Sequence, residues 1–215
     1  MTRLILVRHG QTNYNLLKIY QGQLDIALNE TGRAQAMALK DYVLANELPI
    51  DEIWSSDMQR TRATVAPIAK ALGLPIHLHA GLREIHTGDF SDKTKETVEK
   101  LYPEILDNFS NGHPDPFFPN GESYSQLKER IYSTISDIAK NADGKTVLIA
   151  SHGGSINKFM KRTFEKRGLP VPTDTPTENC SLSYFEYDNE EMVMIEYGRS
   201  TLGSEKERLK DNNTV

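Results

Sequence analysis

Two stretches of this sequence read Leu4-Ile5-Leu6-Val7-Arg8-His9-Gly10 and Val147-Leu148-Ile149-Ala150-Ser151-His152-Gly153-Gly154. Each begins as an unbroken apolar run, which is typical of a strand in a parallel sheet that helices cover on both faces. Because ligands bind beyond the carboxyl ends of strands in such sheets, we expect both imidazoles to project into one crevice. The alternative for either histidine is a polar strand end with no further role. The repetition of the pattern in one chain favours the crevice.

Outward from these stretches, short β-type runs alternate with longer helical patterns. This alternation predicts an α/β fold: a three-layer sandwich with a mostly parallel central sheet and helices on both faces. Strands are expected at residues 4–7, 50–54, 76–78, 146–150, 181–187 and 192–197. One helix is expected to begin at Ser123, where Gln126 completes a capping box, and another directly after Gly154. Within the helical pattern of residues 60–72, Pro67 predicts a kink or a late start.

The 215 residues are enough for one domain, which we expect to span residues 1–202. Residues 85–122 interrupt the alternation, because they contain four prolines and several aromatic residues. We interpret them as a small, partly helical cap insertion that lies over one end of the sheet. Residues 203–215 are polar and are expected to form a frayed tail.

The charge balance and the single cysteine exclude several classes of protein. The chain has 25 Lys and Arg against 30 Asp and Glu, a net charge of −5, which argues against general nucleic-acid binding and binding to anionic membranes. Cys180 alone excludes an intrachain disulfide and a cysteine-based zinc cage. The first apolar run is too short for a signal peptide or a membrane span. We therefore expect a soluble, cytoplasmic protein without nucleic-acid or membrane partners, and the sequence indicates no oligomeric state.

The opening Arg8-His9-Gly10-Gln11-Thr12, followed by Asn15 and Gln21-Gly22, resembles the signature of the histidine phosphatase superfamily, also called phosphoglycerate mutase-like. Four later stretches match the same family in the expected order. They are Ser55-Ser56-Asp57 leading to Arg60, Leu82-Arg83-Glu84, Gly121-Glu122-Ser123 and Ser151-His152-Gly153-Gly154. The resemblance covers the chain to about Tyr197 and implies phosphoryl-transfer chemistry.

The resemblance implies a role for each of four basic residues. His9 is implied as the nucleophile: a neutral imidazole nitrogen attacks phosphorus to give a covalent phosphohistidine, while a backbone carbonyl holds the other ring N–H. Arg8, Arg60 and a protonated His152 are implied to clamp the phosphoryl group, whose charge spreads over three oxygens in a loose transition state. For either arginine the alternative is an ordinary surface salt bridge. Three positive groups leave no need for a metal ion or a cofactor.

Glu84 is the candidate general acid, which protonates the leaving alkoxide and later activates water. The alternative is a solvated loop carboxylate that pairs with the adjacent Arg83. Gly153, with the free backbone N–H groups that open the helix after His152, is expected to bind the phosphate.

Three residues of the opening signature are expected to shape the floor around the phosphate and the neighbouring ester oxygen. They are Asn15, Gln21 and Gly22. The alternative is that they are ordinary turn residues, since Asn and Gly favour turns in any protein.

The family contains both phosphatases and mutases, and the cap bears on the choice between them. A mutase must hold a second anion, which the family's mutases do with Tyr- and Arg-rich segments after the acid glutamate. Here residues 84–129 contain ten carboxylates against four lysines and no arginine, while their aromatic residues suit an apolar or aromatic ester group. The sequence favours a metal-independent phosphomonoesterase that acts on small phosphorylated metabolites. A 2,3-bisphosphoglycerate-dependent phosphoglycerate mutase is the alternative, and a non-catalytic module that binds phosphorylated ligands is a third.

Overall fold

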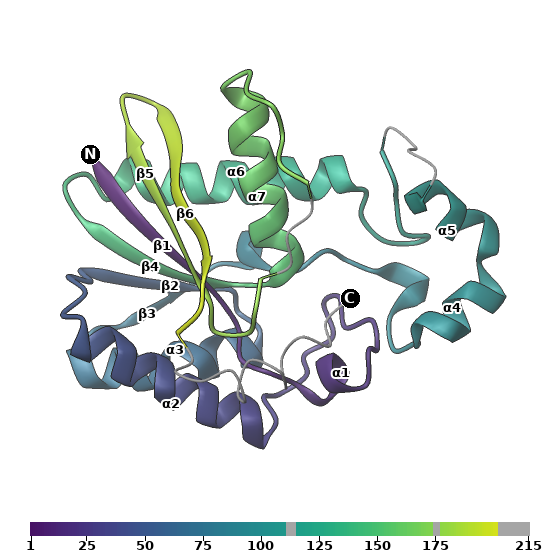
Figure 1. Ribbon diagram of the computed structural model, residues 1–215, viewed down its shortest axis with the longest axis horizontal. Helices are drawn as coiled ribbons and strands as arrows, with labels where there is room; N and C mark the ends of the chain where they lie inside the picture. The colour runs from purple at the N-terminus through teal and green to yellow at the C-terminus, as the bar shows by residue number, and fades with distance from the viewer. Residues whose placement is uncertain (111–114, 174–176, 202–215) are drawn as a thin grey trace.

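The computed structural model describes residues 1–110, 115–173 and 177–201, so the predicted polar tail lies outside the described residues. Its centre is a six-stranded sheet in the order β3-β2-β4-β1-β5-β6 (Figure 1). The strands are β1 Thr2–Arg8, β2 Glu52–Ser55, β3 Ile76–Leu78, β4 Thr146–Ser151, β5 Leu182–Asp188 and β6 Glu191–Arg199. The pairs among β1, β4, β2 and β3 are parallel, and β5 and β6 add antiparallel neighbours at one side. The predicted α/β fold with a mostly parallel sheet is confirmed.

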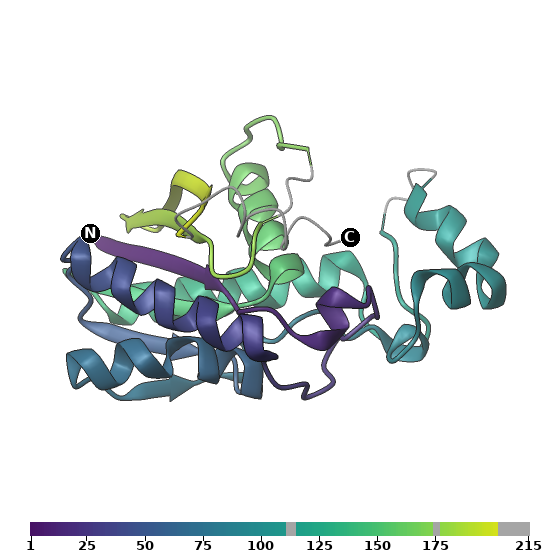
Figure 2. The same cartoon turned by 60° about the horizontal axis from the view of Figure 1, so that its bottom comes forward.

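Helices cover both faces of this sheet (Figures 1 and 2). The α-helices are α1 Asn13–Leu16, α2 Glu30–Ala45, α3 Gln59–Leu72, α4 Lys95–Leu101, α5 Pro103–Ser110, α6 Tyr124–Asn141 and α7 Gly153–Lys166, with short 3₁₀ turns η1 Ala80–Leu82 and η2 Gly88–Phe90. Successive residues of β1 point to opposite faces, as the pleat requires. Leu4 and Leu6 therefore pack with α6 and α7, whereas Ile5 and Val7 pack with α2 and α3. The three layers follow from this alternation.

The capping box predicted for one helix is borne out, whereas two predicted helix starts are not, and one of these is α7, which begins at Gly153 rather than directly after Gly154. Ser123 caps α6, and Gln126 returns the hydrogen bond to its backbone, as the capping box predicts. The late start predicted from Pro67 is wrong, because α3 begins at Gln59 and continues through the proline. Pro67 removes the hydrogen bond to the carbonyl of Ala63, but Ala63 is exposed and water can take that place.

The segment between η1 and α6 forms the cap, which lies beyond the end of the sheet where β1 ends (Figure 2). It carries η2, α4 and α5, and its fully buried Phe90 packs against the rings of Tyr102 and Phe118. The cap is pinned to the loop after α1, because Ile19 bridges Thr94 in antiparallel fashion. No helix among residues 1–110, 115–173 and 177–201 is long and apolar enough to cross a membrane.

Candidate active site

The structure brings His9 and His152 together at the carboxyl end of the sheet. β1 and β4 run parallel with Arg8 opposite Ser151, so the residue after each strand emerges at the same edge. The two imidazole rings lie edge to face with their centroids 5.2 Å apart. Both are buried, with exposed fractions of 3% for His9 and 0% for His152. Strand register alone therefore creates the pair.

The ring of His9 is held in one tautomer. Its Nδ1 lies 2.7 Å from the carbonyl oxygen of Gly10, and since a carbonyl only accepts, Nδ1 carries the hydrogen and Nε2 carries the lone pair. Asn179 donates from its side-chain amide to the His9 carbonyl at 2.7 Å and so holds the backbone of the loop. Burial, with the charges of Arg60 and Arg8, keeps the pKa of His9 well below 6.5. His9 is thus a neutral imidazole with an available nitrogen.

His152 differs from the sequence-based expectation of a protonated ring. Arg60 donates from Nε to His152 Nδ1 at 3.2 Å, and the other ring nitrogen lies 3.0 Å from the hydroxyl of Ser56. Arginine can only donate, so Nδ1 is unprotonated and Nε2 carries the hydrogen. Burial first, then the charge of Arg60, keeps the pKa of His152 well below 6.5. In the free protein the ring is neutral, and the positive charge comes from the arginines.

Arg8 and Arg60 lie at the floor of the site and are buried, so a surface salt bridge does not describe either one. Arg60 is 1% exposed, and its terminal nitrogens donate to the carbonyls of Leu24 at 2.7 Å and Gly22 at 2.8 Å. Burial lowers the pKa of Arg60 to about 10, which leaves it charged at neutral pH. Arg8 donates to the carbonyl of Thr177. Two guanidinium groups are therefore held beside His9 by backbone oxygens.

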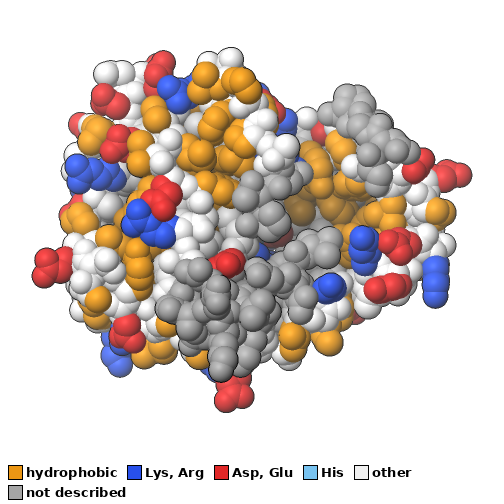
Figure 3. Space-filling model, viewed as in Figure 1, with side chains coloured by type: hydrophobic (Ala, Val, Ile, Leu, Met, Phe, Trp, Pro, Cys, Tyr) orange, Lys and Arg blue, Asp and Glu red, His pale blue; other side chains and the backbone are white. Residues whose placement is uncertain are grey.

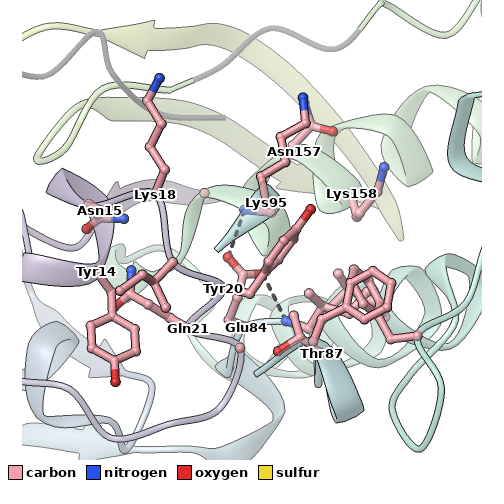
Figure 4. Close-up of a pocket in the computed structure, with 18 of the residues that line it drawn as sticks. Tyr14, Asn15, Lys18, Tyr20, Gln21, Glu84, Thr87, Lys95, Asn157 and Lys158 are labelled. Carbon is pink, nitrogen blue, oxygen red and sulfur yellow. Dashed lines mark hydrogen bonds between the residues drawn. The ribbon is translucent and has the colours of Figure 1, made fainter. Parts of the chain in front are cut away.

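The carboxylate of Glu84, a residue of the loop after η1, packs against the first turn of α7. It accepts from the backbone N–H of Gly154 at 2.9 Å and of Ile85 at 2.9 Å (Figure 4). It also accepts from the hydroxyl of Ser155 at 3.2 Å. The Gly154 N–H, which the sequence suggested would be free for phosphate, is thus donated to Glu84. The alternative prediction, in which Glu84 pairs with the adjacent Arg83, is wrong.

Arg83 instead forms a two-pronged ion pair with Asp57, with nitrogen-to-oxygen distances of 2.7 and 2.5 Å. Its guanidinium is thereby turned away from the carboxylate beside it in sequence. Among the described residues, the hydrogen bonds to the Glu84 carboxylate therefore come from neutral donors, which are two backbone N–H groups and the hydroxyl of Ser155.

Asn15, Gln21 and Gly22 all line the cleft, but only Gly22 lies in a turn, because Asn15 belongs to α1 and Gln21 precedes the turn. Asn15 accepts from Thr12 at the start of α1, and Thr12 in turn donates to the side chain of Gln21 at 2.9 Å. Gly22 has φ of +48°, and a Cβ there would lie 2.2 Å from the hydroxyl oxygen of Thr87. Glycine is therefore required where the chain passes the cap.

A single cleft of about 630 Å³ contains most of these groups. His9, both arginines, Glu84 and Gly153 line it, whereas His152 lies buried behind His9. Hydrophobic side chains gather around the hollow between the body and the cap (Figure 3). They form an apolar wall whose members are Ile19, Tyr20, Ile85, Phe90, Leu106, Phe109, Phe118, Tyr124 and Leu127.

Three lysines that sequence reasoning missed also line this cleft (Figure 4): Lys18, Lys95 and Lys158. Lys158 follows Gly154 by one helical turn, so its place on the same face of α7 could have been read from spacing. Lys18 and Lys95 are the chain neighbours of Ile19 and Thr94, and the bridge between those two residues is a long-range contact that no local pattern reveals. Within the described parts of the chain, no group of three or more His, Cys, Asp or Glu residues is arranged to hold a metal ion.

Comparison with known proteins places this geometry in a family. Residues 4–199 match the histidine phosphatase superfamily (branch 1). A probable phosphoglycerate mutase, GpmB, of Escherichia fergusonii is 32% identical over 205 residues, which is 94% of this chain and 93% of that protein. A metal-independent phosphoserine phosphatase of Arabidopsis thaliana is 34% identical over 165 residues, 75% of this chain and 68% of its own.

Among solved structures, Bacillus stearothermophilus YhfR superposes with a TM-score of 0.83 at 27% identity, covering 93% of this chain and 98% of its own. The family match spans both histidines, both arginines and Glu84. This chain belongs to branch 1 of the histidine phosphatase superfamily.

Proposed function

We propose that this protein is a phosphomonoesterase that hydrolyses small phosphorylated metabolites, without a metal ion, through a phosphohistidine at His9. The observation that carries the proposal is the unprotonated Nε2 of His9 beside two buried, charged guanidinium groups at the floor of an open cleft. A neutral nitrogen is nucleophilic without prior deprotonation. The arginines supply the positive charge that a transferring phosphoryl group needs.

In the first step, Nε2 of His9 attacks phosphorus, the N–P bond forms and the bond from phosphorus to the ester oxygen breaks. Arg8 and Arg60 stabilise the three equatorial oxygens, whose charge the loose transition state spreads. His152 accepts from Arg60 at Nδ1 and donates from Nε2–H to the hydroxyl of Ser56, so its part in this step is to hold the Arg60 guanidinium in position. Glu84, in its protonated form, gives its proton to the departing alkoxide.

In the second step, the Glu84 carboxylate takes a proton from water, which attacks phosphorus and breaks the N–P bond. Inorganic phosphate leaves, and Glu84 is again protonated for the next turnover. The hydrogen bonds from Gly154 and Ser155 fix where the carboxylate stands between these steps. One carboxylate therefore serves both as acid and as base.

The apolar wall of the cleft supports an ester group with apolar or aromatic parts. A relative named as a metal-independent phosphoserine phosphatase supports both the reaction class and the lack of a metal.

The test is phosphate release from a panel of alkyl and aryl phosphates with EDTA present. We expect turnover by the native chain and none by His9→Ala, together with an acid-labile, base-stable phosphoenzyme in quenched native samples. Abolition of activity by EDTA contradicts the metal-free clamp. Turnover without an acid-labile phosphoenzyme contradicts the nucleophilic role of His9.

A phosphoglycerate mutase is the second candidate, because Lys18 and Lys158 from outside the cap join Lys95 of the cap in adding positive charge to the cleft. A probable phosphoglycerate mutase is also among the relatives. The assay is interconversion of 2- and 3-phosphoglycerate with 2,3-bisphosphoglycerate present. Interconversion with little net hydrolysis identifies a mutase, and binding of phosphorylated ligands without turnover in either assay identifies a non-catalytic module.

A further inference from the structure

The loop that carries Glu84 has no regular secondary structure to hold it. Residues 84–87 lie between η1 and η2 and belong to neither a helix nor a strand. Backbone carbonyls that the fold shields from water need donors, and here no ladder of a sheet or helix supplies them. The hydrogen bonds from Gly154 and Ser155 fix the end of the Glu84 side chain. Its backbone must be held by other groups.

The guanidinium of Arg130, near the start of α6, supplies donors to this loop. Its Nη1 donates to the carbonyls of Gly81 at 3.0 Å and Arg83 at 2.9 Å, and its Nη2 donates to the carbonyl of Glu84 at 3.2 Å. One side chain therefore binds the backbone at Glu84 and at residues that precede it.

Glu122, which directly precedes the capping residue of α6, holds Arg130 in this position. Arg130 donates to both carboxylate oxygens of Glu122, from Nε at 2.8 Å and from Nη2 at 2.7 Å. Glu122 also accepts from the backbone N–H of His86 at 2.8 Å, and its own N–H donates to the carbonyl of His86 at 2.9 Å. All five N–H groups of the guanidinium thus have an acceptor, and the ion pair binds the chain on both sides of Glu84.

This ion pair is shielded from water but lies outside the cleft. The side chains of Arg130 and Glu122 are 24% and 20% exposed. Burial opposes ionisation of Glu122, but the hydrogen bonds from Arg130 and from the backbone of His86 outweigh it and keep the pKa of Glu122 below its usual value. Neither Arg130 nor Glu122 lines the cleft, whereas Glu84, to which Arg130 donates, does. A change in the pair therefore reaches the reaction through Glu84.

Accepting the proposed function, we infer that Arg130 and Glu122 are positioning residues for Glu84: their ion pair fixes the backbone from which that carboxylate reaches the leaving group. The start of α7 orients the carboxylate and α6 places its backbone, so two helices hold the proton donor. Loss of the pair should slow proton transfer and leave binding at the phosphate floor unchanged.

The test uses Arg130→Lys and Glu122→Gln. Lysine keeps the positive charge, which after burial contributes to the low pKa of His152, but it has three N–H donors where arginine has five. Glutamine keeps the size of Glu122 and removes its charge. Arg162→Lys is the matched control, because the Arg162 side chain is also 24% exposed, is paired with two carboxylates and does not line the cleft.

The first measurement is the rate of amide hydrogen exchange at Gly154, followed by NMR. This N–H lies in the first turn of α7, where no helical carbonyl is available to it, and it donates to the Glu84 carboxylate. We expect exchange at Gly154 to be about tenfold faster in Arg130→Lys and Glu122→Gln, and unchanged within about twofold in Arg162→Lys. Leu148, fully buried in β4, reports global unfolding. A global loss of stability alone accelerates exchange at Leu148 and leaves a local opening at Gly154 unaffected.

The second measurement is kcat/KM for benzyl phosphate and 4-nitrophenyl phosphate, which covers the steps up to the first phosphoryl transfer. Benzyl alkoxide needs the proton from Glu84, whereas 4-nitrophenolate departs without one. We expect each variant of the pair to lower kcat/KM about tenfold to 10²-fold for the benzyl ester and about threefold or less for the nitrophenyl ester. Inhibition by inorganic phosphate should change less than about twofold, because the phosphate floor is unaltered. Arg162→Lys should match the native chain on both esters.

Equal losses on the two esters, or unchanged exchange at Gly154, in a folded variant of either residue overturn the inference. The same pattern in Arg162→Lys overturns it as well. If one variant fails to fold, the other decides, since each breaks the same ion pair. Phosphate release by the native chain reports the proposed function separately. If the native chain hydrolyses neither ester, the phosphatase is refuted, while exchange at Gly154 still decides whether the pair holds Glu84.

Discussion

Replacing Gly154 by alanine tests whether the position of Glu84 governs the reaction. A Cβ at Gly154 would lie 2.6 Å from Glu84 Oε1, whereas ordinary Cβ contacts begin near 3.4 Å. The carboxylate must therefore retreat by about 0.8 Å, and its hydrogen bond from the Gly154 N–H, now 2.9 Å, is stretched. The α7 backbone cannot yield as easily, because Ser155 and Ile156 beside it are fully buried or nearly so.

A misplacement near 1 Å in a catalytic group costs on the order of 10²-fold in rate, about 2.7 kcal/mol of transition-state stabilisation. The loss should depend on the leaving group. An alkyl phosphate needs the proton from Glu84, so we expect about a 10²-fold decrease in kcat. For 4-nitrophenyl phosphate, whose leaving group departs without a proton, we expect a decrease of tenfold or less.

The assay is kcat with both esters, alongside the melting temperature. Alanine is favoured over glycine inside a helix by about 0.5–1 kcal/mol, so the variant should melt no lower than the native chain. Gly153→Ala is the matched comparison, because its Cβ would lie 3.3 Å from Arg8 Nε and would leave Glu84 in place. Equal losses on both esters, or unchanged activity on both, would refute the reasoning.

Three further outcomes follow from the geometry. His9 and His152 are neutral when folded, so unfolded chains take up protons near pH 6.5 that the native state does not. The contribution of the two histidines to the free energy of unfolding should be constant above that pH and fall below it by about 1.4 kcal/mol per pH unit for each histidine, down to the native pKa values. Urea unfolding between pH 7.5 and 5.0 measures this slope, and His9→Gln should halve it. Asn179→Ala removes the hydrogen bond to the His9 carbonyl and should lower kcat about tenfold with little change in KM, together with a loss of about 1–3 kcal/mol in unfolding free energy; an unchanged kcat would show that the loop holds without it. Arg60→Lys keeps a positive charge but loses the planar guanidinium that donates to His152 and to the carbonyls of Gly22 and Leu24. The variant should lower kcat/KM by about 10²- to 10³-fold in steady-state assays. A loss below tenfold would mean that the positive charge alone suffices.

Short-range patterns were sufficient for the sheet and for the meeting of the two histidines. An apolar run with a pleat of period two must bury both faces, and that condition assigns β1 and β4 to the centre of the sheet. Parallel pairing then puts the ends of both strands at one edge. The Ser123 capping box likewise depends on residues three apart and was predicted without error.

Long-range contacts decided the rest of the site. Glu84 and Gly154 are 70 residues apart, and their hydrogen bond shows that the helix start holds the carboxylate. The neutral state of His152 depends on its burial beside Arg60, which no local residue type reveals.

The electrostatics of the cleft show the same division. Composition counted only the charges of the cap, whereas Lys18 and Lys158 enter the cleft from outside it. Local sequence determines which backbone conformation and which buried face a segment prefers, because those energies arise between near neighbours. Protonation states and charge at a site depend on distance and burial in space, so only the tertiary structure could decide them.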